Sequence, residues 1–451
     1  MKNGRLVVIG GDAAGMSAAS KAKRENPGLD IVVFEKQRFV SFGLCGLPYY
    51  VSGTVKKLED LLTISPEEFR EKRNIDVRLN DEVIKINPDK KSVTAVNEKG
   101  KEHKKKYDKL LIATGAQARI PPLGGVDLRN IFTLHWLEDG KKIRTFVKEK
   151  NPKKVAVAAG YIGLEMAEAF KEMGLEVVIL AKYNHVLPMI DQEIAEPLEK
   201  ELRNHAVEIR KNSEILGFEG NERGEVQKII TKNGEVEVDF VLLGTGVEPA
   251  TDLAKEAGIE LGDSGGIQVN ERMETSIKDI YAAGDCVETT HIVSGKRVNM
   301  PLGDIANRQG RVAGINIANG NASFPGILGT AISKVFSLGV ARTGVSEKEA
   351  GEAGFEFITS TITASSRAFY YPGGCPITIK LIVEKQTGRL LGAQIIGKEG
   401  VSQRINVFAS LIYNKTTVQE IQNLDLAYAP PFSPAWDPIQ TAAKVASGRI
   451  E

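Results

Sequence analysis

Cys45 is the residue best placed for sulfur chemistry in this sequence. The chain has three cysteines, Cys45, Cys286 and Cys375, which are too few for a disulfide scaffold. Nearby glycines leave space for a ligand at Cys45, and Pro48 suits the first turn of a helix. Because a helix N-terminus lowers the pKa of a thiol, it favours the nucleophilic thiolate. A small buried core residue is the alternative for Cys45. We predict a reactive Cys45 and structural roles for the other two.

A glycine-rich turn near the N-terminus has the setting of a pyrophosphate site. Residues 10–15 follow an apolar strand-like run and precede a helical pattern over residues 16–25. Backbone N–H groups and the helix dipole hold a pyrophosphate in such a turn. Glu35 lies twenty residues after Gly15, where its carboxylate can accept a hydrogen bond from a ribose 2′-hydroxyl. A structural turn without a ligand is the alternative.

Asp12 departs from the glycine motif of this turn. It stands at the usual second glycine position, and a carboxylate beside a pyrophosphate is unfavourable. We expect its side chain to turn back and cap the following helix.

The same strand–turn–helix pattern returns at residues 155–173, which implies two nucleotide sites or one duplicated ancestral unit. Ala158 replaces the first glycine of this turn, whereas Gly160 and Gly163 are present. The position corresponding to Glu35 is Ala181, and Lys182 follows it. Since no carboxylate repels a 2′-phosphate there and Lys182 would attract it, we predict that NADPH is accepted, with NADH left open. The alternative is that Lys182 is an ordinary surface lysine.

The elements that must position these residues are those of a multidomain α/β protein. The 451 residues suffice for about three domains. Asp285 ends a further apolar strand, where its carboxylate could bind polyol hydroxyls of a cofactor. The C-terminal third differs, with strand-like runs at 378–383 and 390–396 and a helical stretch at 402–413. The charge run at residues 101–106 predicts a solvated hairpin edge.

The composition excludes several function classes. The net charge of +1 gives no hint of nucleic acid or an anionic membrane surface as a partner. The sequence contains no run of eighteen apolar residues, so it predicts no membrane span. We see no signal region in it either, and we therefore expect a cytoplasmic protein. We assign no metal ligands.

Together these motifs resemble the flavin-dependent pyridine nucleotide–disulfide oxidoreductases over nearly the whole chain. The resemblance implies two Rossmann-like domains, for FAD and NAD(P)H, and a C-terminal α+β dimerisation domain. It places the FAD-binding domain at residues 1–150 and 241–322, the NAD(P)H-binding domain at 151–240 and the dimerisation domain at 323–451. The implied FAD contacts are Gly10, Ala13, Ala14, Gly15, Glu35, Lys36, Val83, Thr114, Gly115, Asp285, Pro301 and Ala306. The implied NAD(P)H contacts are Gly160, Tyr161, Ile162, Gly163, Glu165, Lys182 and Gly246.

Two departures narrow the resemblance to the single-cysteine branch, which includes NADH peroxidase, NADH oxidase and coenzyme A disulfide reductase. Tyr50 stands where related reductases have the second cysteine of a redox pair, and no histidine follows His291 to form their His–Glu dyad. Ala13 stands where the peroxidase type has a histidine. Coenzyme A disulfide reductases and related polysulfide reductases instead have tyrosines from the partner subunit, matched here by Tyr370, Tyr371 and Tyr428. Dimer-interface packing is the alternative for these tyrosines.

The resemblance also implies a path for coenzyme A. Basic residues should meet its phosphates, and Arg24, Arg73, Ser41 and Asn307 match the family's contact positions. Leu44 differs from the asparagine of some relatives.

We therefore predict a homodimeric enzyme that passes electrons from NAD(P)H through FAD to Cys45. The predicted oxidants are coenzyme A disulfide, a coenzyme A mixed disulfide or polysulfide, and coenzyme A itself could stay bound. The alternatives are an NADH oxidase that reduces oxygen at the flavin, an electron-transfer flavoprotein with a protein partner, and a regulatory NAD(P)H sensor.

Overall fold

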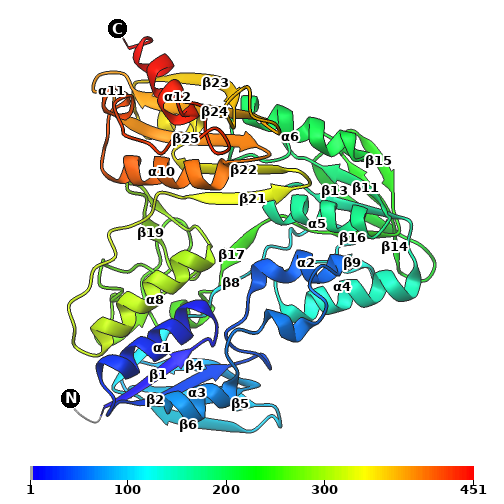
Figure 1. Cartoon of the computed structure of the whole chain (residues 1–451). Helices are drawn as coiled ribbons and strands as arrows, with labels where there is room; N and C mark the ends of the chain where they lie inside the picture. The colour runs from blue at the N-terminus through cyan, green and yellow to red at the C-terminus, as the bar shows by residue number, and fades with distance from the viewer. Residues whose placement is uncertain (1–3, 451) are drawn as a thin grey trace. The chain divides into compact units, whose positions relative to one another are not determined.

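The chain folds into two compact units. Figure 1 shows the helices and strands of the computed structural model, which describes residues 4–450. The first unit consists of the chain up to Arg119, Val247–Thr290 and Arg297–Ile327. The second consists of Ile120–Gly246, His291–Lys296 and the chain from Leu328. The mixed α/β class expected from the sequence is confirmed. The boundaries of the four predicted segments stay a prediction.

The first unit is built on a five-stranded parallel sheet. Its strand order is β18-β7-β1-β2-β3, so the chain leaves β1 in one direction to reach β2 and in the other to reach β7. Near-continuous runs such as Leu6–Ile9 are expected when both faces of a parallel sheet are covered. The strands are β1 (Arg5–Ile9), β2 (Asp30–Glu35), β3 (Asp76–Leu79), β7 (Lys109–Ile112) and β18 (Ile280–Ala282).

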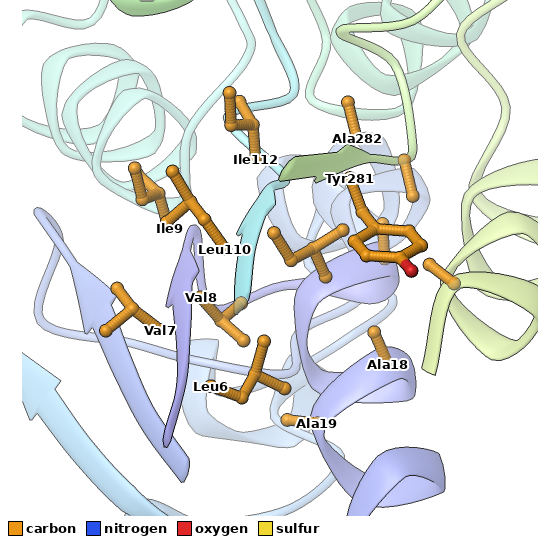
Figure 2. Close-up of a cluster of buried hydrophobic side chains, with 14 of the residues drawn as sticks. Leu6, Val7, Val8, Ile9, Ala18, Ala19, Leu110, Ile112, Tyr281 and Ala282 are labelled. Carbon is orange, nitrogen blue, oxygen red and sulfur yellow. The ribbon is translucent and has the colours of Figure 1, made fainter. Parts of the chain in front are cut away.

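Side chains from this sheet and helix α1 (Ala13–Glu25) form a buried hydrophobic core. Figure 2 shows Leu6 and Val8 of β1, Leu110 of β7 and Tyr281 of β18 gathered with Ala18 of α1. All five side chains are at most 5% exposed. Burying this apolar surface stabilises the sheet and fixes the strand ends that carry the glycine turn.

The first unit also contains an antiparallel sheet, two short strand pairs and further helices. The antiparallel sheet β4-β5-β6 includes the predicted charged hairpin edge as β6, which is confirmed. Its strands are β4 (Asp81–Asn87), β5 (Ser92–Asn97) and β6 (Glu102–Lys106). Two short pairs are β8 (Ala116–Ala118) with β17 (Val247–Pro249) and β19 (Thr289–Thr290) with β20 (Arg297–Val298). The other helices are η1 (Leu44–Gly46), α2 (Leu47–Ser52), η2 (Leu58–Leu61), α3 (Pro66–Arg73), α7 (Asp252–Glu256) and α8 (Gly303–Ile317).

The second unit contains a second parallel sheet, ordered β12-β11-β10-β16-β9. Its strands are β9 (Ile131–Phe132), β10 (Lys154–Ala158), β11 (Glu176–Leu180), β12 (Val207–Arg210) and β16 (Phe240–Leu242). The associated helices are α4 (Leu137–Lys150), α5 (Tyr161–Glu172) and α6 (Gln192–Asn204), and an antiparallel sheet is formed by β13 (Ile215–Gly220), β14 (Val226–Thr231) and β15 (Gly234–Glu237).

A five-stranded antiparallel sheet completes the second unit, in the order β21-β22-β25-β24-β23. Its strands are β21 (Ala331–Val335), β22 (Leu338–Gly344), β23 (Phe357–Ser365), β24 (Pro376–Glu384) and β25 (Leu390–Gly397). The helices are α9 (Glu347–Glu352), α10 (Val401–Tyr413), α11 (Val418–Ile421) and α12 (Pro438–Ser447). The strands and helix expected at 378–383, 390–396 and 402–413 are therefore confirmed within two residues at each end.

Candidate active site and nucleotide sites

The carboxyl ends of four parallel strands bring the predicted FAD residues together in the first unit. Gly10 follows β1, Glu35 ends β2, Thr114 follows β7 and Asp285 follows β18. Strands β1 and β7 are neighbours in the sheet, and the strand order reverses between them. Ligands of open α/β sheets bind at this kind of switch point, outside the carboxyl ends of the strands.

The glycine turn after β1 has no room for a side chain at Gly15. A Cβ atom there would lie 1.9 Å from Gly10 O. The backbone N–H of Gly11 donates to Glu35 Oε2 (2.7 Å), and that of Gln37 donates to Glu35 Oε1 (2.7 Å). Burial raises the pKa of Glu35, and each of its oxygens still has a lone pair for a ribose hydroxyl. The turn and carboxylate therefore fit a dinucleotide.

Asp12 does not cap α1 with its side chain, so that prediction is wrong. Asp12 occupies the N-cap position, but its side chain makes no cap hydrogen bond. Instead Asp12 Oδ1 accepts the backbone N–H of Phe42 at 3.0 Å. The more distant donor is available because the chain returns past the turn after β2, which local capping rules do not anticipate.

The other predicted FAD residues lie on the same unit. Thr114 Oγ1 donates to Ala250 O (2.6 Å), and Gly115 has a φ of +70° with open space where a Cβ would stand. Burial raises the pKa of Asp285 to about 6. The rest are placed at the start of α1, after β2, within β4, and just before or within α8: Ala13, Ala14, Lys36, Val83, Pro301 and Ala306.

The second parallel sheet repeats this arrangement after β10. A Cβ atom at Gly163 would lie 2.1 Å from Ala158 O, which matches the close approach at Gly15. Alanine is tolerated at position 158 because it ends β10 in extended conformation, whereas Gly10 has a φ of +105°. Gly160, Tyr161 and Ile162 fill the turn and the start of α5, and Gly246 follows β16. This arrangement fits a second dinucleotide.

Two of the predicted NAD(P)H residues have partners that the sequence did not indicate. Lys182 Nζ forms an ion pair with Glu214 Oε1 at 2.6 Å, so Lys182 is neither an isolated surface lysine nor an unopposed cation. Glu165 Oε1 accepts a hydrogen bond from Ser333 Oγ of β21 at 3.0 Å. Burial raises the pKa of Glu165.

Cys45 is exposed and lies in the 3₁₀ turn η1, directly before α2. Pro48 is in the first turn of α2, as predicted, although this helix has only six residues. A buried core position for Cys45, the alternative drawn from the sequence, is excluded. The Cys45 side chain is therefore accessible from solvent.

The other two cysteines have different surroundings. Cys286 is fully buried, and its Sγ donates to Ala283 O at 3.4 Å. Burial raises the pKa of the Cys286 thiol to about 11, which suppresses the thiolate at neutral pH. Cys375 is partly exposed in the loop before β24, and its backbone N–H donates to Ser366 Oγ at 3.0 Å.

Three of the four predicted coenzyme A residues gather at α1, since Arg24 is part of this helix and Arg73 and Asn307 contact it. Arg24 Nε donates to Ser20 O (3.2 Å), and Arg73 Nη1 donates to Ser20 Oγ (3.0 Å), so two guanidinium groups meet at one serine. Asn307 Oδ1 accepts from Ser17 Oγ, one turn earlier on α1. Ser41 is separate from this group and is linked to the glycine turn by its N–H bond to Gly11 O (2.9 Å). Ser17 and Ser20 were missed in the sequence, although their spacing to Arg24 on a helical face was visible.

The predicted tyrosines belong to an exposed aromatic patch in the second unit. Tyr370 Oη and Tyr428 Oη are 3.1 Å apart, and the Tyr428 hydroxyl raises the pKa of Tyr370. Tyr371 lies nearby under the Arg367 guanidinium. Phe369 packs edge-on against Tyr370 in this patch. Phe432 and Trp436 are large apolar side chains of the same unit that are exposed as well. Exposed apolar surface of this kind marks protein interfaces.

Family models settle the membership of the chain. Residues 4–310 match the model of the pyridine nucleotide-disulphide oxidoreductases, and residues 330–438 match the dimerisation domain of the same enzymes. The chain belongs to this family. The oxidoreductase class and the nucleotide cofactors expected from the sequence, FAD and NAD(P)H, are confirmed at this level.

Proteins similar to this chain are named for several different activities. The chain is 42% identical over 447 residues to a CoA-dependent NAD(P)H sulfur oxidoreductase of Pyrococcus furiosus, with 99% of each chain covered. It is 37% identical to an NADH oxidase of Methanocaldococcus jannaschii, over 99% of each chain. It is 33% identical to a coenzyme A disulfide reductase of Staphylococcus aureus, over 95% of this chain and 96% of the relative. A solved NAD-dependent persulfide reductase of A. fulgidus superposes with a TM-score of 0.96 at 41% identity, over 99% of this chain and 83% of that one.

Within residues 4–450, no helix is long and apolar enough to cross a membrane. The same residues contain no group of three or more histidine, cysteine, aspartate or glutamate side chains arranged to hold a metal ion.

Proposed function

We propose that this protein is an FAD-dependent reductase that passes electrons from NAD(P)H to Cys45 and then to coenzyme A disulfide, a coenzyme A mixed disulfide or polysulfide. The observation that carries the proposal is the accessible Cys45 thiol, held on a segment that is hydrogen-bonded to the glycine turn. The sulfur and coenzyme A chemistry in the names of the relatives supports the choice of substrate.

The chemistry on Cys45 is thiol–disulfide exchange. The Cys45 thiolate attacks one sulfur of the substrate disulfide, which forms a mixed disulfide at Cys45 and releases the other half as a thiolate. Two electrons then cleave the mixed disulfide, restore the Cys45 thiolate and release the second thiol after protonation. With polysulfide, the same attack breaks one S–S bond, leaves a persulfide on Cys45 and releases the shortened polysulfide. Two electrons and a proton then restore the Cys45 thiolate and release hydrosulfide.

FAD, when bound, supplies the two-electron transfer between NAD(P)H and sulfur. The chain's own residues provide binding and orientation. The glycine turn and Glu35 would hold the pyrophosphate and ribose of FAD, and Asp285 would accept from its polyol hydroxyls. Gly160 and Gly163 would place NAD(P)H through the corresponding turn of the second unit.

Tyr428 is our candidate for protonating the leaving thiolate, with Tyr370 as its hydrogen-bonding partner. The exposed aromatic patch around them supports a homodimer in which these side chains reach the Cys45 site of the partner subunit. A cytoplasmic location is part of the same proposal.

Arg73 and Arg24 would bind the phosphates of coenzyme A. We expect Arg73→Ala to raise the KM for coenzyme A disulfide about tenfold, because a charge-assisted hydrogen bond to phosphate is lost. The KM for inorganic polysulfide should stay unchanged. Steady-state kinetics with both substrates test this, and Lys72→Ala, a change at the exposed neighbouring cation, is the matched control. Equal effects of Arg73→Ala on both substrates would argue against a phosphate contact.

Lys182 and Glu214 should set the choice between NADPH and NADH. We expect Lys182→Met to raise the KM for NADPH, because the cation that attracts the 2′-phosphate is removed. Glu214→Gln should lower it about threefold, the scale of an exposed ion pair that no longer competes for Lys182. The KM for NADH, measured alongside, is the internal control. Parallel changes for both dinucleotides would contradict a role at the 2′-position.

Turnover with coenzyme A disulfide, polysulfide and oxygen, measured side by side on the same FAD-loaded enzyme, tests the proposed function. We expect kcat/KM for a sulfur substrate to exceed that for oxygen. The second candidate is an NADH oxidase, favoured by the name of the Methanocaldococcus jannaschii relative. Faster turnover with oxygen would favour it, and negligible turnover with every small acceptor would favour electron transfer to a protein or an NAD(P)H sensor.

A further inference from the structure

Two hydrogen bonds join the glycine turn to residues 41–45, the segment that carries Cys45. The backbone N–H of Ser41 donates to Gly11 O (2.9 Å), and that of Phe42 donates to Asp12 Oδ1 (3.0 Å). Ser41 has a φ of +52°, a conformation that costs a non-glycine residue free energy and persists only where neighbours hold it. The two contacts hold the backbone on both sides of this strained residue.

Backbone groups hold the opposite side of the Cys45 segment. The N–H of Thr63 donates to Ser41 O (2.8 Å), and the N–H of Gly43 donates to Leu61 O (2.9 Å). Within this set of contacts Asp12 is the side chain that takes part. The start of the segment is therefore clamped between the glycine turn and the chain after η2.

An aspartate at position 12 is costly. Burial raises the pKa of Asp12 to about 7, and the nearby Glu35 and Asp285 carboxyls add to the shift. The usual glycine of the motif would have none of these costs. The contact with the Phe42 N–H is the larger of the two backbone interactions that offset them, the other being with the Ala13 N–H.

We propose that Asp12 is a positioning residue for Cys45, which it orients by holding the Phe42 N–H at the start of the Cys45 segment. The inference rests on the proposed function, since it takes Cys45 as the reactive thiol. Asp12 thereby acts on the Cys45 thiol through the backbone, without contacting the sulfur.

The test compares Asp12→Gly with Asp12→Asn in the FAD-loaded protein. Asp12→Gly restores the usual motif residue and removes the acceptor, whereas Asp12→Asn keeps an oxygen at Oδ1. The readout is the rate of Cys45 alkylation by iodoacetamide as a function of pH, located by peptide mass spectrometry so that Cys375 is scored separately. FAD content is measured by absorbance.

We expect Asp12→Gly to retain FAD while the pH profile of Cys45 alkylation shifts from that of the wild type, because the backbone that places the thiol is no longer held at Phe42. Asp12→Asn should keep the wild-type profile. A wild-type profile in Asp12→Gly, or the same shift in Asp12→Asn, would overturn the proposal. Asp12→Ala, which also lacks the acceptor, replaces Asp12→Gly if that variant does not fold. Because alkylation needs no disulfide substrate, this result is independent of whether coenzyme A disulfide is turned over.

Discussion

Cys45→Ser should abolish reduction of coenzyme A disulfide and polysulfide while leaving the flavin in place. We expect kcat to fall by on the order of a thousandfold, because a serine hydroxyl is a far weaker nucleophile toward sulfur than a thiolate. Reduction of bound FAD by NAD(P)H should continue near the wild-type rate, since in the proposed order of electron transfer Cys45 accepts electrons only after the flavin does. Stopped-flow absorbance separates this half-reaction from turnover.

Cys375→Ser is the matched control for this experiment. Cys375 is the other thiol with some exposure among the described residues, whereas Cys286 is fully buried. We expect Cys375→Ser to turn over both substrates like the wild type. Wild-type disulfide reduction by Cys45→Ser would remove the role assigned to Cys45.

Gly15→Ala and Gly163→Ala should separate the two nucleotide sites. Each new Cβ would meet a carbonyl oxygen, at 1.9 Å and 2.1 Å respectively, and neither backbone oxygen can rotate away. We expect Gly15→Ala to be isolated with little or no FAD. Gly163→Ala should retain FAD that dithionite reduces but NAD(P)H does not. Flavin absorbance before and after each reductant is the measurement.

These two variants are each other's controls, because they make the same change in the same kind of turn. Loss of FAD from both, with cooperative unfolding preserved, would contradict the assignment of the second turn to NAD(P)H. Full FAD content and normal reduction in Gly15→Ala would contradict the assignment of the first turn.

Much of the fold was predictable because its signals are local. The apolar runs of β1 and β10, the turns after them and the patterns of α10 and β24 are visible in short windows of sequence. The pairing of strands was not visible. The placement of β18 beside β7, with 167 residues between Ile112 and Ile280, depends on contacts between distant parts of the chain.

The candidate site likewise combines residues that the sequence indicates with contacts that it does not indicate. Cys45, Glu35 and Gly15 stand out by residue type and spacing. The structure places Glu35 and Gly15 at the carboxyl ends of neighbouring parallel strands, β2 and β1. The partners of Asp12 and Lys182 were not predictable, because Phe42 and Glu214 lie about thirty residues away in sequence. Asp12 was expected to cap its own helix because local rules consider only the nearest donors.

Trapping the intermediate on Cys45 tests the central claim most directly. The FAD-loaded enzyme is reduced with NAD(P)H, mixed with coenzyme A disulfide, quenched in acid and digested, and the peptides are weighed by mass spectrometry without a reducing agent. We expect a peptide containing Cys45 that carries one coenzyme A in disulfide linkage. Rapid turnover with no adduct at Cys45, or with the adduct on Cys375 instead, would contradict it.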